Sequence, residues 1–239
     1  MPELVDDLVL LPTGSHCVAI HVTREEAADH AVAFIEGSAP DRATSYWVDT
    51  PSLAAYYTEL LKERSPQHVG CVHVLEREHI EPQGGHLRPV EEISEFLRAN
   101  PDGVTGGADT ISRYWSLEDL PAHLEYEEWF QAQPRDRSRF LCPYDLRAVP
   151  VEEAPEVLRE LGFHHSHVAL SSSPEPAVRL LQLFLFGETD RLPRELEGTL
   201  AWAVESGYLD PGDAGSEFAL TASGDRLVRE WSRAAVIDW

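Results

Sequence analysis

Short apolar runs alternate with amphipathic segments over the first 170 residues of the chain. This alternation is the pattern of an α/β protein with a mostly parallel sheet flanked by helices. Thr23 and Glu26 form a Thr-x-x-Glu capping box, and Pro51 occupies a favourable first-turn position. We expect strands at 17–22, 44–49, 69–75, 103–105, 138–144 and 166–170, and helices at 23–36, 50–64, 89–99, 117–133 and 151–161.

The character of the chain changes after residues 171–176, which form a linker by composition. Beyond it we expect helices at 177–186, 193–206 and 222–235, with a short strand at 217–221. The first of these helices is almost wholly apolar, so it either packs on the α/β domain or serves as an interface. The sequence therefore divides into an α/β domain (1–170), a linker (171–176) and a small C-terminal α+β domain (177–239).

The charge of the chain is strongly negative, with 42 acidic and 19 basic residues among 239 and a net charge of −23. Lys62 is the only lysine. Such a surface is what we expect of a protein kept soluble in molar salt, because salt screens the self-repulsion of the carboxylates. We therefore expect a halophilic, cytoplasmic protein, with an ordinary acidic cytosolic protein as the alternative.

Two patterns argue against a membrane protein. No apolar run approaches the ~20 residues that span a bilayer. The N-terminal segment is acidic, whereas a signal peptide begins with basic residues. We therefore expect no membrane association.

The motifs of nucleotide and acyl-transfer enzymes are absent from the chain. It contains no Gly-x-x-x-x-Gly-Lys-Ser/Thr, no Gly-x-Gly-x-x-Gly and no Gly-x-Ser-x-Gly. Cys142 could act as a nucleophile, but a cysteine that closes a strand is more often a core residue, and reactivity needs a lowered pKa. We therefore predict a protein that is not an enzyme, with no catalytic residues and no cofactor.

The cysteines and histidines do not predict a metal site. Cys17, Cys71 and Cys142 lie in separate apolar segments, which favours buried free thiols over a disulfide framework. The stretches 68–73 and 164–167 look superficially metal-like, but neither has a standard zinc spacing and no second pair of cysteines exists. We therefore expect no metal.

The run Phe-Leu-Cys-Pro-Tyr-Asp-Leu-Arg at 140–147 is the most informative stretch of the chain. Its apolar start indicates a buried strand, and Cys142, Tyr144, Asp145 and Arg147 follow near the end of that strand. In an open α/β sheet, ligands bind at the carboxyl ends of the strands. The run therefore indicates a ligand site at that edge.

Several short motifs, taken in order, resemble those of the MEDS domain, a sensory domain named for methanogens, methylotrophs and the DcmR repressor. The resemblance covers about residues 13–170. The chain departs from the family at 106–109, where the family tends to carry a glutamate, and at Pro143, which replaces the usual Gln. The matching segments are 14–20, 46–49, 85–89, Trp115, 126–127, 142–145 and His165.

The resemblance implies a RecA/KaiC-like α/β sandwich that has lost its phosphate loop and senses a small molecule. The two departures imply that the ligand differs from those of the family, or that the pocket is vestigial. The residues that would cluster at the ligand pocket are His16, Trp115, Glu127, Cys142, Tyr144, Asp145 and His165.

Residues 207–209 and 218–228 resemble the wing and closing helix of prokaryotic winged-helix regulators, including TbsP-type regulators of haloarchaea. Three arginines share one face of the last expected helix, and two more flank the start of the helix before it, where backbone donors favour phosphate. The DNA-contacting residues would therefore be Arg191, Arg194, Arg226, Arg229 and Arg233.

Two features of the expected C-terminal domain (177–239), called the tail below, argue against DNA binding. The stretch 180–208 is about one helix short of a full helix-turn-helix. The helix at 193–206 also carries Glu195, Glu197 and Glu205, which are unsuited to reading the major groove.

We therefore expect a transcriptional regulator, a homodimer that binds promoter DNA and an unidentified small-molecule effector. The alternative is a signalling adaptor whose tail mediates dimerisation or protein docking through the apolar run at 180–186, without DNA. A residual nucleotide-binding enzyme is a third hypothesis, and it requires ATP binding despite the missing phosphate-loop lysine.

Overall fold

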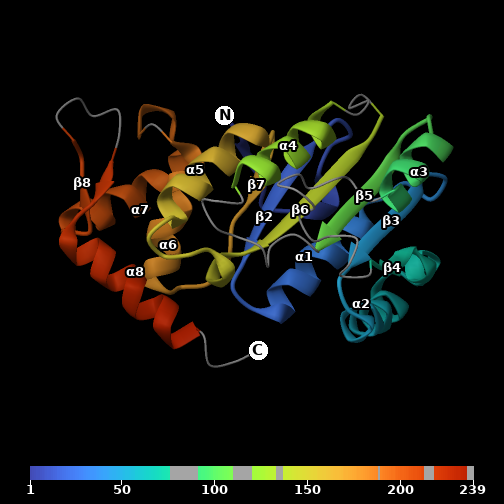
Figure 1. Ribbon diagram of the computed structural model, residues 1–239, viewed down its shortest axis with the longest axis horizontal. Helices are drawn as coiled ribbons and strands as arrows, with labels where there is room; N and C mark the ends of the chain where they lie inside the picture. The colour runs from blue at the N-terminus through green and yellow to red at the C-terminus, as the bar shows by residue number, and fades with distance from the viewer. Residues whose placement is uncertain (76–90, 110–119, 133–136, 188, 213–217, 236–239) are drawn as a thin grey trace.

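Seven parallel strands form one sheet in the order β1-β7-β2-β6-β5-β3-β4 (Figure 1). The computed structural model describes residues 1–75, 91–109, 120–132, 137–187, 189–212 and 218–235. The predicted α/β class with a parallel sheet flanked by helices is confirmed. The strands are β1 (Glu3–Leu4), β2 (His16–His21), β3 (Ala43–Val48), β4 (Val72–Val74), β5 (Val104–Asp109), β6 (Arg139–Asp145) and β7 (His167–Ala169).

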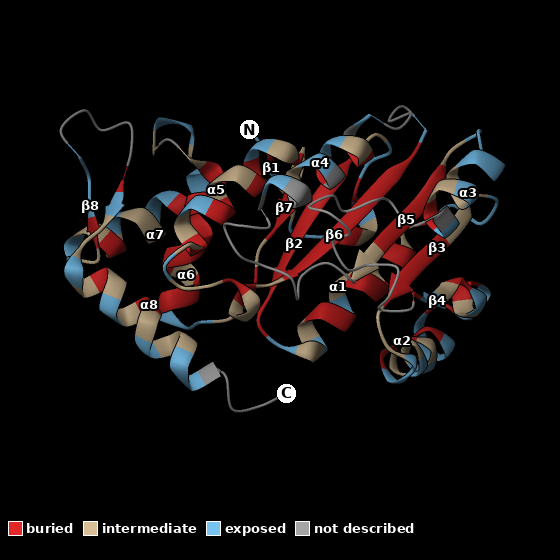
Figure 2. Ribbon diagram, viewed as in Figure 1, coloured by how far each residue is buried: buried red, intermediate tan, exposed pale blue. Residues whose placement is uncertain are grey.

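Helices cover both faces of this sheet. Cys17 and Leu141 share a core cluster with α1 and α2, whereas Cys142 and Tyr144 share one with α5. Successive side chains of a strand point to opposite faces of the sheet. Leu141 therefore packs against the layer of α1 and α2, and Cys142 against the layer of α5. Figure 2 shows the buried strands between them. The helices are α1 (Arg24–Glu36), α2 (Pro51–Arg64), α3 (Glu91–Ala99), α4 (Leu120–Gln131) and α5 (Ala154–His164).

The helix starts follow the local signals of the sequence, with one difference. Thr23 accepts a hydrogen bond from the Glu26 amide, as the predicted capping box requires. The carboxylate of Glu26 does not complete the box, because it accepts from the Val22 amide and from Ser171 and Ser172. This carboxylate therefore ties the segment after β7 to the start of α1.

Two strands of the sheet differ from their predicted ranges by three residues or more at one end, and a further strand was not predicted. Residues Pro66–Cys71 form the 3₁₀ helix η2, so only Val72–Val74 pair as β4. Strand β5 continues to Asp109 through Gly106 and Gly107. A Cβ at Gly107 would lie 2.6 Å from the Tyr46 ring, so the glycine makes room for that ring. The two-residue β1, which pairs with β7 at the sheet edge, was not predicted.

The tail begins with an apolar helix that changes character half-way. The predicted helix at 177–186 is α-helical only as far as α6 (Pro176–Gln182) and continues as the 3₁₀ helix η5 (Leu183–Phe186). Gly187 ends it with φ 66°, a left-handed conformation that favours glycine. The remaining elements are η6 (Thr189–Arg191), α7 (Arg194–Glu205), the antiparallel pair β8 (Leu209–Asp210) and β9 (Ala219–Leu220), and α8 (Ala222–Ala235).

The apolar run at 180–186 is buried within the chain. Leu180, Leu183 and Phe186 belong to the same core cluster as residues of α5 and the sheet. Helix α5 approaches η5 so closely that a Cβ at Gly162 would lie 1.9 Å from the Leu185 carbonyl oxygen. The docking surface that the adaptor hypothesis placed at 180–186 is therefore covered by this chain's own α5. None of the described helices is long and apolar enough to cross a membrane.

Candidate functional site

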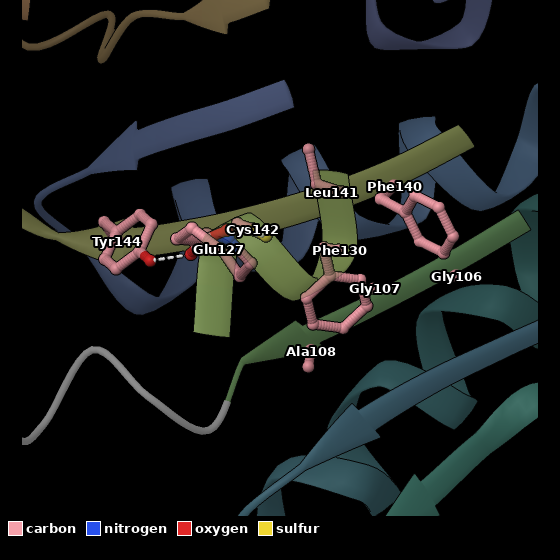
Figure 3. A pocket seen from close by; sticks show the side chains of 10 residues that line it. Gly106, Gly107, Ala108, Glu127, Phe130, Phe140, Leu141, Cys142 and Tyr144 are labelled. Atoms are coloured by element: carbon pink, nitrogen blue, oxygen red, sulfur yellow. Dashed lines mark hydrogen bonds between the residues drawn. The ribbon is translucent and has the colours of Figure 1, made fainter. Parts of the chain in front are cut away.

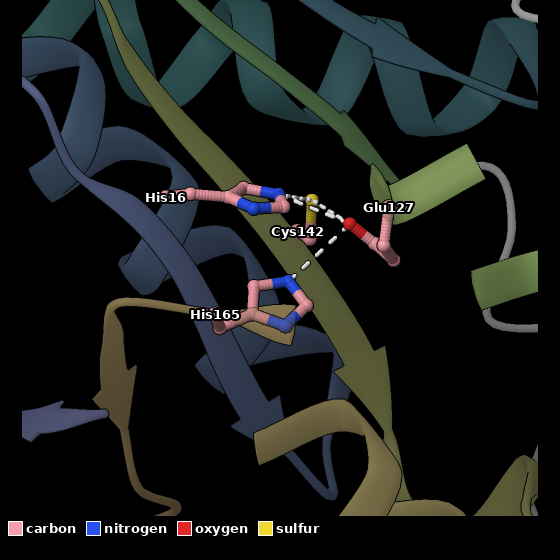
Figure 4. A group of neighbouring side chains, drawn as sticks. All are labelled: His16, Glu127, Cys142 and His165. Carbon is pink, nitrogen blue, oxygen red and sulfur yellow. Dashed lines mark hydrogen bonds and ion pairs between the residues drawn. The ribbon is translucent and has the colours of Figure 1, made fainter. Parts of the chain in front are cut away.

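Four buried polar side chains meet between the sheet and its helices (Figure 4). They are His16, Glu127, Cys142 and His165, called the buried tetrad below. One nitrogen, oxygen or sulfur atom from each lies within 4.8 Å of those of the other three. Their exposed fractions are 1%, 1%, 9% and 4%, respectively. Solvent therefore contributes little to the electrostatics of the group.

The parallel register and one covering helix bring the tetrad together. His16 opens β2, and the paired strand β6 carries Cys142 two residues beyond the register partner of His16, Phe140. Residues two apart share a face, so Cys142 lies on the same face as Phe140. Helix α4 contributes Glu127, and His165 lies between the end of α5 and the start of β7. Positions far apart in the sequence thus meet at three neighbouring strands.

Glu127 lies at the centre of the tetrad. Its Oε2 lies 3.0 Å from His16 Nε2, 3.4 Å from His165 Nε2 and 3.5 Å from Cys142 Sγ. Its Oε1 accepts a hydrogen bond from the Tyr144 hydroxyl. Burial by itself would raise the pKa of Glu127. The charge of His165 and hydrogen bonds from both histidines outweigh burial, so the pKa lies well below the ordinary value.

The orientation of the His165 ring is set from its other side. Nδ1 of His165 lies 2.8 Å from the Leu161 carbonyl oxygen, which can only accept, so Nδ1 carries the proton. In the neutral ring, Nε2 then directs a lone pair at the Glu127 carboxylate. That arrangement is repulsive unless a proton or another positive charge lies between the two groups.

Cys142 is a protonated thiol in this environment. Its Sγ lies 3.2 Å from His16 Nε2. Burial raises the pKa of Cys142 well above the ordinary thiol value, and the negative charge of Glu127 raises it further. A nucleophilic cysteine needs the opposite shift. The arrangement therefore does not favour thiolate catalysis.

The space beside the tetrad is very small. The cavity has a volume of about 10 Å³, roughly what one water molecule requires (Figure 3). Phe130 and Phe140 contribute to its wall, and the Phe130 ring stacks on His16 with 6.0 Å between centroids. Sequence reasoning missed Phe130, although it lies one helical turn after Glu127. The cavity fits a water or a single ion, and no organic effector of ordinary size.

The structure brings together five of the seven residues predicted to cluster at a ligand pocket: His16, Glu127, Cys142, Tyr144 and His165. Asp145 does not join them, because its carboxylate accepts hydrogen bonds from the backbone amide and guanidinium of Arg147. Trp115 lies outside the described residues. The matched segment 85–89 lies outside them as well.

The location of the group differs from the sequence expectation. The carboxyl-end rule predicted a site where β6 ends, at Asp145. The tetrad instead lies on one face of the sheet, beside the first residue of β2 and beneath α4. The two metal-like stretches contribute only His165 to it. Among the described residues, the stretch 68–73 does not gather a ligand group of its own.

The five arginines predicted to contact DNA have different surroundings. Arg229 is half-buried and donates to Asp225 at 2.8 Å and to Glu152 at 2.5 Å. It therefore links α8 to the segment before α5. The other four, Arg191, Arg194, Arg226 and Arg233, are exposed.

Comparison of the chain with protein-family models, with curated proteins and with solved structures found no match. The resemblance to the MEDS domain and to winged-helix regulators therefore rests on the motifs alone. A function for the chain is therefore inferred from its residues and their geometry.

Proposed function

We propose that the chain is a non-catalytic DNA-binding regulator. The α/β domain, with the buried tetrad, is its sensing part, and the C-terminal arginines contact DNA phosphates. A protonated Cys142 beside a water-sized cavity supports the non-catalytic part of this proposal, because the described residues at the tetrad offer neither an activated nucleophile nor room for an organic substrate there.

One observation supports the regulatory part of the proposal. Two consecutive residues of α5 contact the buried tetrad and the C-terminal domain, respectively. The Leu161 carbonyl holds the His165 ring, and the next residue, Gly162, packs directly against the Leu185 backbone of η5. Any change that moves His165 therefore acts on the helical turn that contacts the tail. Close-packed interfaces of this kind transmit small shifts because they do not deform continuously.

The arginines supply a surface for phosphate contacts. Arg226 and Arg233 are exposed on α8, and Arg194 is the exposed first residue of α7. The N-terminal end of a helix favours anions, although Glu195 and Glu197 also lie in the first turn of α7. Counterion release contributes little to binding in molar salt. The arginines would then act through directed hydrogen bonds to phosphate oxygens, which fix the position of the protein on the duplex. Replacing two of them with glutamate removes those hydrogen bonds and places two carboxylates against the phosphates, so a large loss of binding is expected.

The experiment is capture of sheared genomic DNA of the source organism by the purified chain in molar salt, followed by sequencing. We expect enrichment of discrete promoter fragments by the wild type and loss of enrichment in Arg226→Glu/Arg233→Glu. The control is Lys62→Glu/Arg98→Glu, which makes the same charge change at exposed positions of α2 and α3. Arg229 is left intact because its two ion pairs support the fold.

The proposal fails if the wild type enriches no fragment, or if both double variants enrich the same fragments equally. A flat profile favours the adaptor alternative. That adaptor would need a surface other than 180–186, since α5 and the sheet pack against that run.

A further inference from the structure

We propose that the buried tetrad is a binding site for one Zn²⁺-type divalent metal ion, with four protein ligands. The ligand atoms are His16 Nε2, His165 Nε2, Cys142 Sγ and Glu127 Oε2. This inference goes beyond the proposed function and does not depend on DNA binding.

Four of the six separations between the ligand atoms are close to those of a tetrahedral site, and one ligand atom from each residue lies within 4.8 Å of the other three. Zinc bonds of about 2.0–2.1 Å to nitrogen or oxygen and about 2.3 Å to sulfur place two such ligands about 3.3 Å apart, or about 3.5 Å when one is sulfur. Glu127 Oε2 lies 3.0 and 3.4 Å from the two histidine nitrogens. Sγ of Cys142 lies 3.2 Å from His16 Nε2 and 3.5 Å from Glu127 Oε2.

Groups outside the tetrad hold two of the ligands in coordinating orientations. The His165 Nδ1–H donates to the Leu161 carbonyl, which leaves the Nε2 lone pair directed at the shared centre. Tyr144 donates to Glu127 Oε1, which leaves Oε2 as a single ligand oxygen (Figure 3). Metal-bound histidines and carboxylates usually have such outer partners.

The charges of the tetrad also fit a divalent ion. A Cys142 thiolate and a Glu127 carboxylate carry two negative charges, which a dication neutralises with both imidazoles uncharged. A complex without net charge is favoured here, because a net charge is costly to bury away from water. The dication also removes the repulsion between the His165 lone pair and Glu127. An ordinary hydrogen-bonded network would need an imidazolium at the same place.

The ligand chemistry selects the class of metal. Two imidazoles, one thiolate and one carboxylate in tetrahedral arrangement suit Zn²⁺, whereas Mg²⁺ and Ca²⁺ prefer oxygen ligands in larger numbers. Four protein ligands and a water-sized neighbouring cavity indicate a closed site of the structural type.

The test is titration of the full chain with Co²⁺, a spectroscopic substitute for Zn²⁺, after treatment with a chelator and a thiol reductant. We expect one Co²⁺ per chain, with a thiolate-to-cobalt charge-transfer band and the ligand-field spectrum of a tetrahedral ion. Added Zn²⁺ should abolish both. Binding should also release a proton from the Cys142 thiol, which calorimetry in buffers of different ionisation enthalpy measures.

Matched cysteine variants locate the site. Cys142→Ala should lose the charge-transfer band, whereas Cys71→Ala, at another buried thiol, should keep it. Tyr144→Phe keeps all four ligands and should weaken Co²⁺ binding about 10- to 100-fold through the loss of the outer hydrogen bond.

Two results would overturn the proposal. One is a wild-type chain that binds no Co²⁺ with a charge-transfer band, a result that does not depend on how any variant folds. The other is a band that persists in Cys142→Ala or disappears in Cys71→Ala.

Discussion

Nε2 of His165 lies 3.4 Å from Oε2 of Glu127, and both side chains are buried. Glu127 belongs to α4 and His165 to the connection between α5 and β7, so the two residues are distant in sequence. The Leu161 carbonyl fixes the proton on the far side of the ring. The contact therefore requires a positive charge between the two residues, either a proton or a metal ion. This requirement couples the chemical state of the tetrad to the end of α5.

The contact between α5 and η5 should tolerate no added side chain at Gly162. We expect Gly162→Ala to lower the free energy of unfolding by about 2 kcal/mol or more, because its Cβ would lie 1.9 Å from the Leu185 carbonyl oxygen. Chemical denaturation measures the change.

The matched control for Gly162→Ala is Gly198→Ala in α7, where a Cβ meets nothing within 4 Å. This substitution should stabilise the chain by about 0.5–1 kcal/mol, because alanine has the higher helix propensity. Equal effects at the two glycines would contradict the close packing of α5 on η5.

Tyr144 should stabilise the metal-free chain through its hydrogen bond to Glu127. We expect Tyr144→Phe to cost about 2 kcal/mol, since a buried carboxylate oxygen loses its donor. Tyr57→Phe is the control. Its hydroxyl donates to Asp109, whose half-exposed carboxylate can bind water instead, so less than about 1 kcal/mol should be lost. A loss at Tyr57 as large as that at Tyr144 would contradict this account.

Cys71 should make the chain less stable in alkali. Burial raises the pKa of Cys71 from 9.0 to about 12, so the thiol ionises first in the unfolded chain. Its contribution to stability is present below about pH 9 and is lost as the pH rises toward about 12. By about pH 10.5 the loss should reach up to about 2 kcal/mol.

The measurement compares Cys71→Ala with the wild type by denaturation at about pH 8 and about pH 10.5. The stability of the wild type relative to the variant should fall by that amount between the two pH values. A difference that stays constant with pH would show that the thiol is accessible in the folded chain.

The secondary structure was predictable where its signals are local. Thr23 accepts a hydrogen bond from the Glu26 amide at the start of α1, and Pro51 is the first residue of α2, as their sequence positions indicated. The cap that Thr50 forms with the Leu53 amide was not singled out. Strand β4 was predicted to begin at residue 69 because Val69 and Cys71 are apolar, yet both belong to the 3₁₀ helix η2. Strand β5 was predicted too short because Gly106 and Gly107 look like breakers, whereas Gly107 accommodates the Tyr46 ring.

The members of the candidate site were predictable from motifs, but their arrangement was not. The alternation of β6 places Cys142 and Tyr144 on one face. Nothing in the sequence shows that α4 covers that face and contributes Glu127 beside both. A metal-ligand set from positions 16, 127, 142 and 165 has no local spacing, so a search for metal motifs could not find it.

The central claim is that the tail binds promoter DNA through its exposed arginines. Chromatin immunoprecipitation of the tagged chain in its source organism, followed by sequencing, tests this claim most directly. The account predicts sharp peaks at a limited set of promoters, and their loss in Arg226→Glu/Arg233→Glu at unchanged protein level. A flat profile for the wild type would contradict it.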